Sequence, residues 1–235
     1  MRLILCLFLL SLSSFAQSSL MLETGAVWQY RNDVRIDPKT GDTLEFDEFQ
    51  DSPSLHYRLE YHLNLNRKHA LRLIYAPYKV QVEGKVSKDI RFKEETFSKN
   101  KNIKVNYKFN SYRLGYKYLF SKSFNFGLTL KIRDAEISLE QDDKKESYDN
   151  IGLVPLFYFS YFKHLTDRCY IYTDIDFAAA PQGRAIDLAV KLRRSLTRRS
   201  DVGIGVRSLE GGAENDKVYT FSWLNYLIVD YKYSF

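Results

Sequence analysis

Hydrophobic and polar residues alternate with a period of two along most of this 235-residue chain. In SLHYRLEYHLNL, which begins at residue 54, Leu55, Tyr57 and Leu59 share one face, while Arg58 and Glu60 share the other. The segments FNFGLTLKIRD and RAIDLAVKLRRSL, beginning at residues 124 and 184, repeat this alternation. A period of two is typical of β-strands that have one apolar and one polar face. The pattern therefore predicts an all-β protein.

The predicted strands are longer than those of most soluble proteins. Strands in soluble domains average about 5–6 residues, whereas a strand that crosses a bilayer needs about 9–11. We expect ten strands, at residues 20–34, 54–65, 69–84, 103–120, 124–139, 151–165, 169–179, 184–196, 201–209 and 217–235. The same pattern also allows about eight or about twelve strands, and bacterial barrels of both sizes are possible because their strand number is even. Several of the ten segments are long enough to span a membrane.

The connections between the predicted strands alternate between short and long. NRKH, SKS, TDR and TRRS are the short ones. RIDPKTGDTLEFDEFQDSP, KVSKDIRFKEETFSKNKN and QDDKKESYDN are long, and APQG and EGGAEND, on the same side, are shorter. Short turns on one rim and longer loops on the other are the pattern of outer-membrane barrels. An even number of strands places both termini on the short-turn, periplasmic side.

The amino-terminal stretch MRLILCLFLLSLSSFAQ has the features of an export signal. Arg2 precedes an apolar run, and small residues lead to Ala16, as at a secretory cleavage site. The apolar run ends at Leu12 and is shorter than the roughly 20 residues that a transmembrane helix needs. We therefore expect residues 1–16 to be removed and residues 17–235 to form one barrel domain.

The carboxy-terminal segment NYLIVDYKYSF ends in alternating aromatic residues, Tyr231, Tyr233 and Phe235. In this feature the chain resembles bacterial outer-membrane β-barrel proteins, whose last strand ends in an aromatic residue. The segments APQGRAIDLAVKL (180–192) and RSLEGGAENDKVYTFSWLNY (207–226) are similar to blocks in small outer-membrane proteins of unassigned role. The resemblance implies a closed antiparallel up-and-down barrel in the bacterial outer membrane. It also implies that the three aromatic residues form an assembly signal read by the barrel-assembly machinery.

Two predicted strands depart from simple alternation. IKVNYKFNSYRLGYKYLF is apolar at odd positions as far as Phe109 and at even positions from Tyr112. A β-bulge or an extension of the strand beyond the membrane would produce this change. In the last strand, Leu224, Tyr226 and Ile228 share the face that should point into the barrel.

Charges of both signs occupy the predicted inner faces of the strands, in a chain with a net charge of +6. A barrel of about 8–10 strands has an interior that side chains fill or leave as a narrow solvent path. Charges there must pair or stay hydrated, because burying an isolated ion is costly. We predict an interior charge network of Arg58, Glu60, Arg72, Arg113, Lys131, Arg133, Asp174, Asp176, Asp187, Lys191 and Arg193. Such an interior favours a structural or interaction role at the cell surface, and a narrow channel for ions or small solutes is the alternative.

Candidate catalytic groups are few. His56 and His62 could share a face with Glu60, which makes these three residues weak candidates for a lipid-modifying enzyme. A general base needs a reacting group within hydrogen-bond reach, and the sequence identifies none. EGGAENDK carries hard oxygen ligands but lacks the spacing of a calcium loop. We expect no enzyme activity, no metal and no cofactor.

The expected partners follow from export and charge. The basic stretch KVSKDIRFKEETFSKNKNIKVNYK would face the phosphates of outer-membrane lipids and lipopolysaccharide if it is extracellular. Export and the lack of a recognition module argue against nucleic acid. Once the signal is removed, Cys169 is the remaining cysteine, so no internal disulfide is expected. We expect a monomer. A soluble lipocalin-like barrel is a further alternative, and it would require the apolar faces to point inward.

Overall fold

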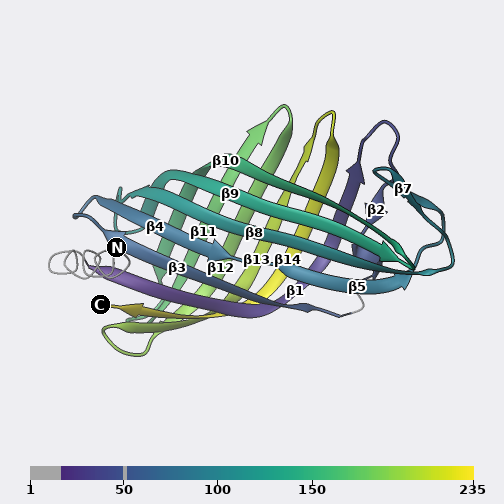
Figure 1. The fold of residues 1–235 in the computed structure, drawn as a ribbon. Coiled ribbons are helices and arrows are strands. Elements are labelled where there is room, and N and C mark those ends of the chain that lie inside the picture. Colours follow the sequence, from purple (N-terminus) through teal and green to yellow (C-terminus); the bar gives the residue numbers. More distant parts are fainter. Residues whose placement is uncertain (1–16, 50–51) are drawn as a thin grey trace, which may run out of the picture.

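The computed structural model describes residues 17–49 and 52–235, so the predicted export signal lies outside the described residues. Antiparallel strands form one sheet, in which β14 also pairs with β1 and closes a barrel (Figure 1). The wall consists of β1 (Ser18–Ile36), β3 (Ser54–Asn64), β4 (His69–Ala76), β5 (Lys79–Lys85), β8 (Asn102–Tyr118), β9 (Phe124–Gln141), β10 (Lys144–His164), β11 (Cys169–Ala180), β12 (Gly183–Ser195), β13 (Ser200–Glu214) and β14 (Val218–Ser234). Outside it lie β2 (Leu44–Glu45), the short 3-10 helix η2 (Asp47–Phe49), β6 (Ile90–Phe92) and β7 (Glu95–Phe97).

The barrel wall has ten strands, as predicted. β4 and β5 both pair with β8, and the register is unbroken from Ala76↔Ser111 to Lys79↔Lys108. They are two halves of one wall strand, interrupted at Pro77, which has no N–H for a ladder hydrogen bond. β2 is a short addition that pairs with β1 alone. The closed antiparallel barrel inferred from the sequence is confirmed.

The start of β1 and the end of β14 lie at the rim that carries the short turns, which we call the rim of the termini (Figure 1). These turns join β3 to β4, β8 to β9, β10 to β11 and β12 to β13. At the opposite rim the strands run further than the sequence pattern predicted. QDDKKESYDN was expected to be a loop, but β9 and β10 continue through it and leave only Asp142 and Asp143 between them. Likewise, most of EGGAEND belongs to β13, which ends at Glu214. Alternating polar segments at the rim were misjudged as loops because they lack an apolar face.

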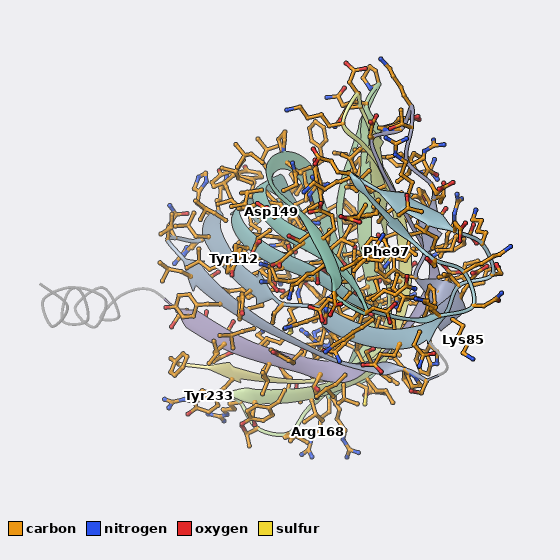
Figure 2. All side chains as sticks on the ribbon, turned by 45° about the vertical axis from the view of Figure 1, so that its right-hand side comes forward. Lys85, Phe97, Tyr112, Asp149, Arg168 and Tyr233 are labelled. Carbon is orange, nitrogen blue, oxygen red and sulfur yellow. The ribbon has the colours of Figure 1, made fainter. Side chains whose placement is uncertain are left out.

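The apolar face of the wall points outward. Leu55 and Leu59 are 72% and 42% exposed, whereas Arg58 and Glu60, between and beside them, are 1% and 2% exposed. Figure 2 shows side chains on both faces of the wall, with Tyr112 on its outer side. An exposed apolar belt around a closed sheet fits hydrocarbon. The lipocalin-like alternative is wrong, because it required the opposite orientation. Among the described residues, no helix is long and apolar enough to span a membrane.

One β-bulge reverses the alternation in β1. The register with β14 shifts between Gln29 and Arg31, so Tyr30 is an extra residue and is 67% exposed. Odd-numbered residues such as Val27 point inward before the bulge, and even-numbered residues such as Val34 point inward after it. The first strand therefore keeps one inner face despite its broken sequence pattern.

The phase change in β8 is not a bulge. β8 pairs with β9 in one unbroken register from Lys104 to Tyr118, and its odd-numbered side chains point inward throughout. What changes is the chemistry of the interior. Near the short turns the inward residues are charged, as at Arg113, and towards the other rim they are apolar, as at Val105. Of the two explanations, the β-bulge is therefore wrong, and an extension of the strand beyond the membrane stays a prediction.

Candidate functional site

The interior near the middle of the barrel is crossed by a set of ion pairs, which we call the interior ion cluster. Its members come from eight wall strands and are Glu23, Arg58, Glu60, Arg72, Arg113, Asp176, Asp187, Lys191, Arg193, Arg207 and Asp230. Each of them is at most 4% exposed apart from Asp230, at 6%. Such charges need close partners, since burial removes most of their hydration.

Asp187 on β12 joins three arginines from three other strands. Arg58 Nη1 lies 3.2 Å and Arg113 Nη2 2.6 Å from Asp187 Oδ2, and Arg207 Nη1 contacts Oδ1. Arg113 also reaches Asp176 Oδ2 at 2.7 Å. The carboxylates therefore connect opposite sides of the wall through shared guanidinium groups.

Glu23 on β1 forms a second centre, which the sequence reasoning missed. Arg207 donates to both of its oxygens, at 3.0 and 3.1 Å, and Lys191 Nζ contacts Oε2. His56 Nε2 lies 3.1 Å from Oε1. Strict alternation around Glu23, with Met21 buried and Leu22 exposed, was the signal that could have identified it.

Arg72 fills the space between β4 and β11. Its Nη2 lies 2.6 Å from Asp176 Oδ1, and its guanidinium stacks 3.8 Å from the centre of the Tyr158 ring. Gly115 makes room for it, because a Cβ there would lie 3.2 Å from Arg72 Nε. Stacking on an aromatic face adds to the attraction of a cation that is out of water.

The structure brings most, but not all, of the predicted network residues into ion pairs. Within 4.0 Å of an opposite charge lie Arg58, Glu60, Arg72, Arg113, Asp174, Asp176, Asp187, Lys191 and Arg193. Asp174 is at that limit, 4.0 Å from Arg72. Lys131 and Arg133 also point inward, yet neither has a carboxylate within this distance among the described residues. They line a cavity instead.

The two candidate catalytic histidines are held by carboxylates. His62 Nε2 lies 2.8 Å from Glu60 Oε1, and Glu60 also lies 3.4 Å from Arg58. His56 contacts Glu23 and lies edge-on to the Tyr226 ring. Among the described residues, the polar partners of the two imidazole rings are these carboxylates, and neither ring has a hydrogen bond to a hydroxyl or thiol that a base could activate. Within the described chain, no group of three or more His, Cys, Asp or Glu could hold a metal ion.

Beyond the ion cluster, towards the rim opposite the termini, the interior is apolar. Buried residues of β1 and β14 pack against those of β5, β8 and β9, and we call this packing the outer apolar core. Leu224, Tyr226 and Ile228, which looked anomalous in the sequence, belong to it. The basic stretch after β5 is anchored there too, because Phe92 and Phe97 of the β6–β7 hairpin are 1% and 0% exposed.

Cations of this basic stretch pair with acidic residues at the β9–β10 tip. Lys93 Nζ lies 2.8 Å from Glu146 Oε1, and Lys101 Nζ lies 2.6 Å from Asp142 Oδ2. The hydrogen bond from Lys93, together with the Ser147 N–H, lowers the pKa of the Glu146 carboxyl. The basic stretch was predicted to face lipid phosphates, but part of its positive charge is neutralised by carboxylates of the protein itself.

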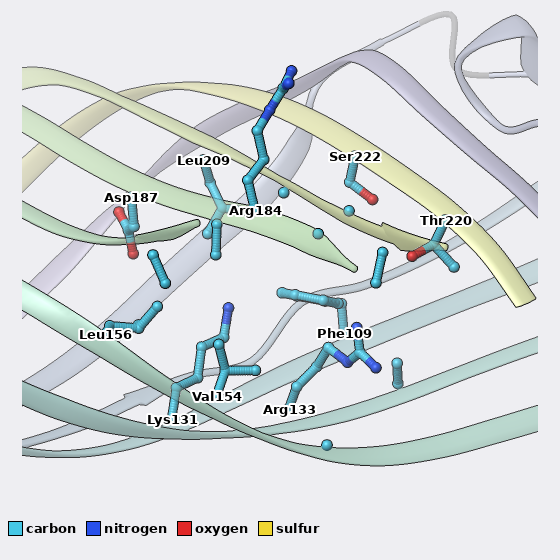
Figure 3. Close-up of a pocket in the computed structure, with 18 of the residues that line it drawn as sticks. Phe109, Lys131, Arg133, Val154, Leu156, Arg184, Asp187, Leu209, Thr220 and Ser222 are labelled. Atoms are coloured by element: carbon cyan, nitrogen blue, oxygen red, sulfur yellow. The ribbon is translucent and has the colours of Figure 1, made fainter. Parts of the chain in front are cut away.

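A cavity of about 540 Å³, which we call the side cavity, lies next to the ion cluster, on the side towards the rim opposite the termini and beside the outer apolar core (Figure 3). Arg113, Asp176 and Asp187 belong both to its lining and to the ion cluster. The rest of its lining is mostly apolar and comes from β8 to β14, with Val34 of β1. Cavities of this size hold small molecules.

The side cavity reaches the outer surface through a gap in the wall. β10 and β11 pair only from His164↔Tyr170 to Phe157↔Phe177, although β10 continues to Lys144. The β9–β10 and β11–β12 hairpins diverge from there (Figure 1). Leu153 and Phe157 line the cavity and are also 64% and 60% exposed on the outer face. The cavity therefore opens sideways between β10 and β11.

Comparison with solved structures identifies the class of fold. The chain is similar to the outer membrane protease OmpT from Escherichia coli, with a TM-score of 0.61 and 8% sequence identity over 93% of this chain and 97% of that one. Lower similarity is found to Ail, the attachment invasion locus protein of Yersinia pestis, with a TM-score of 0.42 and 12% identity over 93% and 99% of the two chains. The P. putida toluene transporter TodX gives a TM-score of 0.39 and 7% identity over 93% and 90%.

The chain therefore has the fold of a bacterial outer-membrane β-barrel. At such low identity the likeness shows the fold alone, and the roles named for these three proteins differ from one another. No protein-family model and no curated protein matches the chain. Its function has to be argued from its own interior.

Proposed function

We propose that this barrel is a closed, non-conducting protein of the bacterial outer membrane that acts by binding at its outer end, without enzyme activity. The observation that carries the proposal is the interior ion cluster, in which Asp187 and Glu23 draw side chains of opposite walls together. The outer apolar core lies beyond it along the same path through the barrel. Both would have to separate before a solute could pass straight through.

The test is conductance in a planar bilayer. Barrel that migrates as a folded species in a heat-modifiability gel should insert without producing steady current steps. Asp187→Asn and Glu23→Gln together should increase the current, because four cations then lose a carboxylate and repel one another. Reproducible channels from the unaltered protein would overturn the proposal and favour the narrow-channel alternative.

A lipid-modifying enzyme is the weaker alternative, since His56 is buried, His62 is half-buried, and both contact carboxylates. Lipid A mass spectra from cells with and without the protein test it directly. Unchanged spectra support the binding role, and a mass shift abolished by His62→Gln would establish the enzyme.

The location and the assembly route are part of the same proposal. Phe235 is 62% exposed, its N–H donates to Ser18 O at 2.9 Å, and its ring lies edge-on to Tyr233, with the ring centres 5.2 Å apart. Tyr231 is 46% exposed on the same outer face. Both rings are open to recognition by the assembly machinery and to contact with outer-membrane lipids, as a monomer would present them. Deleting Phe235 should lower the amount of heat-modifiable barrel in outer-membrane fractions, while Phe235→Trp should preserve it.

A further inference from the structure

The gap between β10 and β11 begins at a proline. Phe162 N–H donates to Ser123 O, ahead of β9, at 2.8 Å, and Leu165 N–H donates to Cys169 O, at the start of β11, at 2.9 Å. The direction of the backbone N–H alternates from residue to residue along a strand. In β10 the N–H groups of even-numbered residues therefore face β9, and those of odd-numbered residues face β11. Pro155 is the first odd-numbered position beyond the paired region, and it has no N–H to offer β11. The ladder stops where its next donor is missing.

The free edge of β10 lies at the level of the apolar belt. Leu153 and Ile151 beside it are 64% and 73% exposed on the outer face. An open strand edge within hydrocarbon is tolerated only where it is covered by protein or lines a cavity, because its backbone groups need partners. The side cavity lies directly behind this edge, so the edge borders both the cavity and the membrane.

Two cations of β9 in the side cavity have no carboxylate partner within the part of the chain that the structure describes. Lys131 is 6% exposed, and its Nζ lies 4.8 Å from the centre of the Phe109 ring. Arg133 donates to Asn150 Oδ1 at 2.6 Å, and its Nε has no hydrogen-bond partner. Gly152 leaves it room, since a Cβ there would lie 3.2 Å from Arg133 Nη2. Figure 3 shows both side chains pointing into the cavity.

The carboxylates that line the cavity are already paired with other cations. The pairs are Glu136 with Lys108, Asp176 with Arg72 and Arg113, Asp187 with Arg58, Arg113 and Arg207, and Glu210 with Arg184. The excess positive charge in the cavity is therefore that of Lys131 and Arg133. A buried cation without a counter-charge is costly, and an anion bound between the two would neutralise it.

We propose that the side cavity binds a single-chain amphiphile with an anionic head, which enters sideways through the gap between β10 and β11. The head, a carboxylate or a phosphate, pairs with Lys131 and Arg133. The chain lies against Val154 and Leu156 and extends past Pro155 into the hydrocarbon of the membrane. This site deepens the proposed function, since it gives the closed barrel a ligand class and a lateral route of entry.

The test is calorimetric titration of the barrel, folded in nanodiscs of zwitterionic lipid, with decanoate, decyl phosphate and decanol, after subtraction of empty nanodiscs. Both anions should bind at least about tenfold more tightly than decanol, the contribution expected of a charge-assisted contact. Whichever anion binds more tightly indicates whether a free acid or a phosphate ester is preferred. Lys131→Met combined with Arg133→Gln should abolish the preference over decanol.

The matched control is Lys85→Gln combined with Lys104→Met, which removes two charges from exposed or half-buried positions of β5 and β8 outside the cavity lining. It should leave the preference intact. Val154→Trp should fill the cavity and weaken all three ligands, whereas Ile151→Trp, on the outer face, should not. Each variant is first shown to be heat-modifiable.

Three results would overturn the site: equal binding of decanol and decanoate, a preference that survives the loss of both cations, or binding unchanged by Val154→Trp. If binding fails while the bilayer stays silent, the site is wrong and the closed barrel stands. If the barrel conducts, the proposed function itself fails.

Discussion

Replacing Asp187 by asparagine tests whether the interior ion cluster stabilises the barrel. The substitution keeps the size of the side chain and removes the charge that Arg58, Arg113 and Arg207 share. Breaking a buried pair by removing one partner costs about 3–5 kcal/mol. Each arginine here keeps another carboxylate: Glu60 at 3.4 Å for Arg58, Asp176 at 2.7 Å for Arg113 and Glu23 at 3.0 Å for Arg207.

We therefore expect the lower end of that range, about 3 kcal/mol. This corresponds to roughly a hundredfold increase in the unfolding equilibrium constant. The measurement is reversible urea unfolding in lipid vesicles, followed by tryptophan fluorescence. Asp201→Asn is the control, because Asp201 lies at the short-turn rim, 4.0 Å from Lys232, and should lose less than about 1 kcal/mol. Equal losses for the two variants would mean that water, not the arginines, solvates Asp187.

Three further predictions concern the wall and the outer end. A nitroxide at Val190, which is 42% exposed, should collide with oxygen dissolved in the bilayer, whereas one at Lys191, which is 1% exposed, should not. Equal accessibility of the two nitroxides to oxygen would contradict the orientation of the wall. Phe97→Ala should cost about 3–5 kcal/mol locally and make the β6–β7 hairpin sensitive to trypsin, and a resistant hairpin would show that the outer apolar core does not hold it. Because the Glu146 pKa is lowered, its contact with Lys93 is fully present above the ordinary carboxyl range and is lost as the pH falls through the depressed value. The protection of the hairpin amides against hydrogen exchange, corrected for the intrinsic exchange rate, should therefore fall only below the ordinary carboxyl range.

The wall could be predicted from the sequence because its signal is local. Alternation along one strand, as from Leu55 to Glu60, is enough to separate the lipid face from the interior face. The bulge at Tyr30 breaks this signal in β1. Glu23 lies before the bulge, where the alternation holds, so its inward position was overlooked although the signal was present. Strand pairing then resolves what single-strand patterns leave open.

For the interior, the sequence predicted the type of residue but not the contacts that these residues make. Charges at alternate positions indicated an ionic interior, but which carboxylate meets which guanidinium depends on strands that are far apart in the sequence. The outer apolar core was hidden because the apolar face of a strand was assigned to lipid, whereas around Val105 the apolar face of β8 points inward. In β14, Leu224 makes both faces look apolar. Pro155 was a visible signal for the side opening, since a proline inside a predicted strand removes one ladder hydrogen bond. Its effect on the wall could be inferred only once the strand that Pro155 faces, β11, was known.

The position of Glu23 has a consequence for how the barrel is made. Glu23 lies on the first wall strand, whereas its partners Lys191 and Arg207 lie on β12 and β13, across the seam where β14 meets β1. Until the first and last strands join, these two cations face an unfinished edge without this carboxylate. Before closure they keep, of the acidic residues that the structure describes, only Asp230, for Lys191, and Asp187, for Arg207, as partners. Sealing the seam therefore completes the set of carboxylates around these two cations.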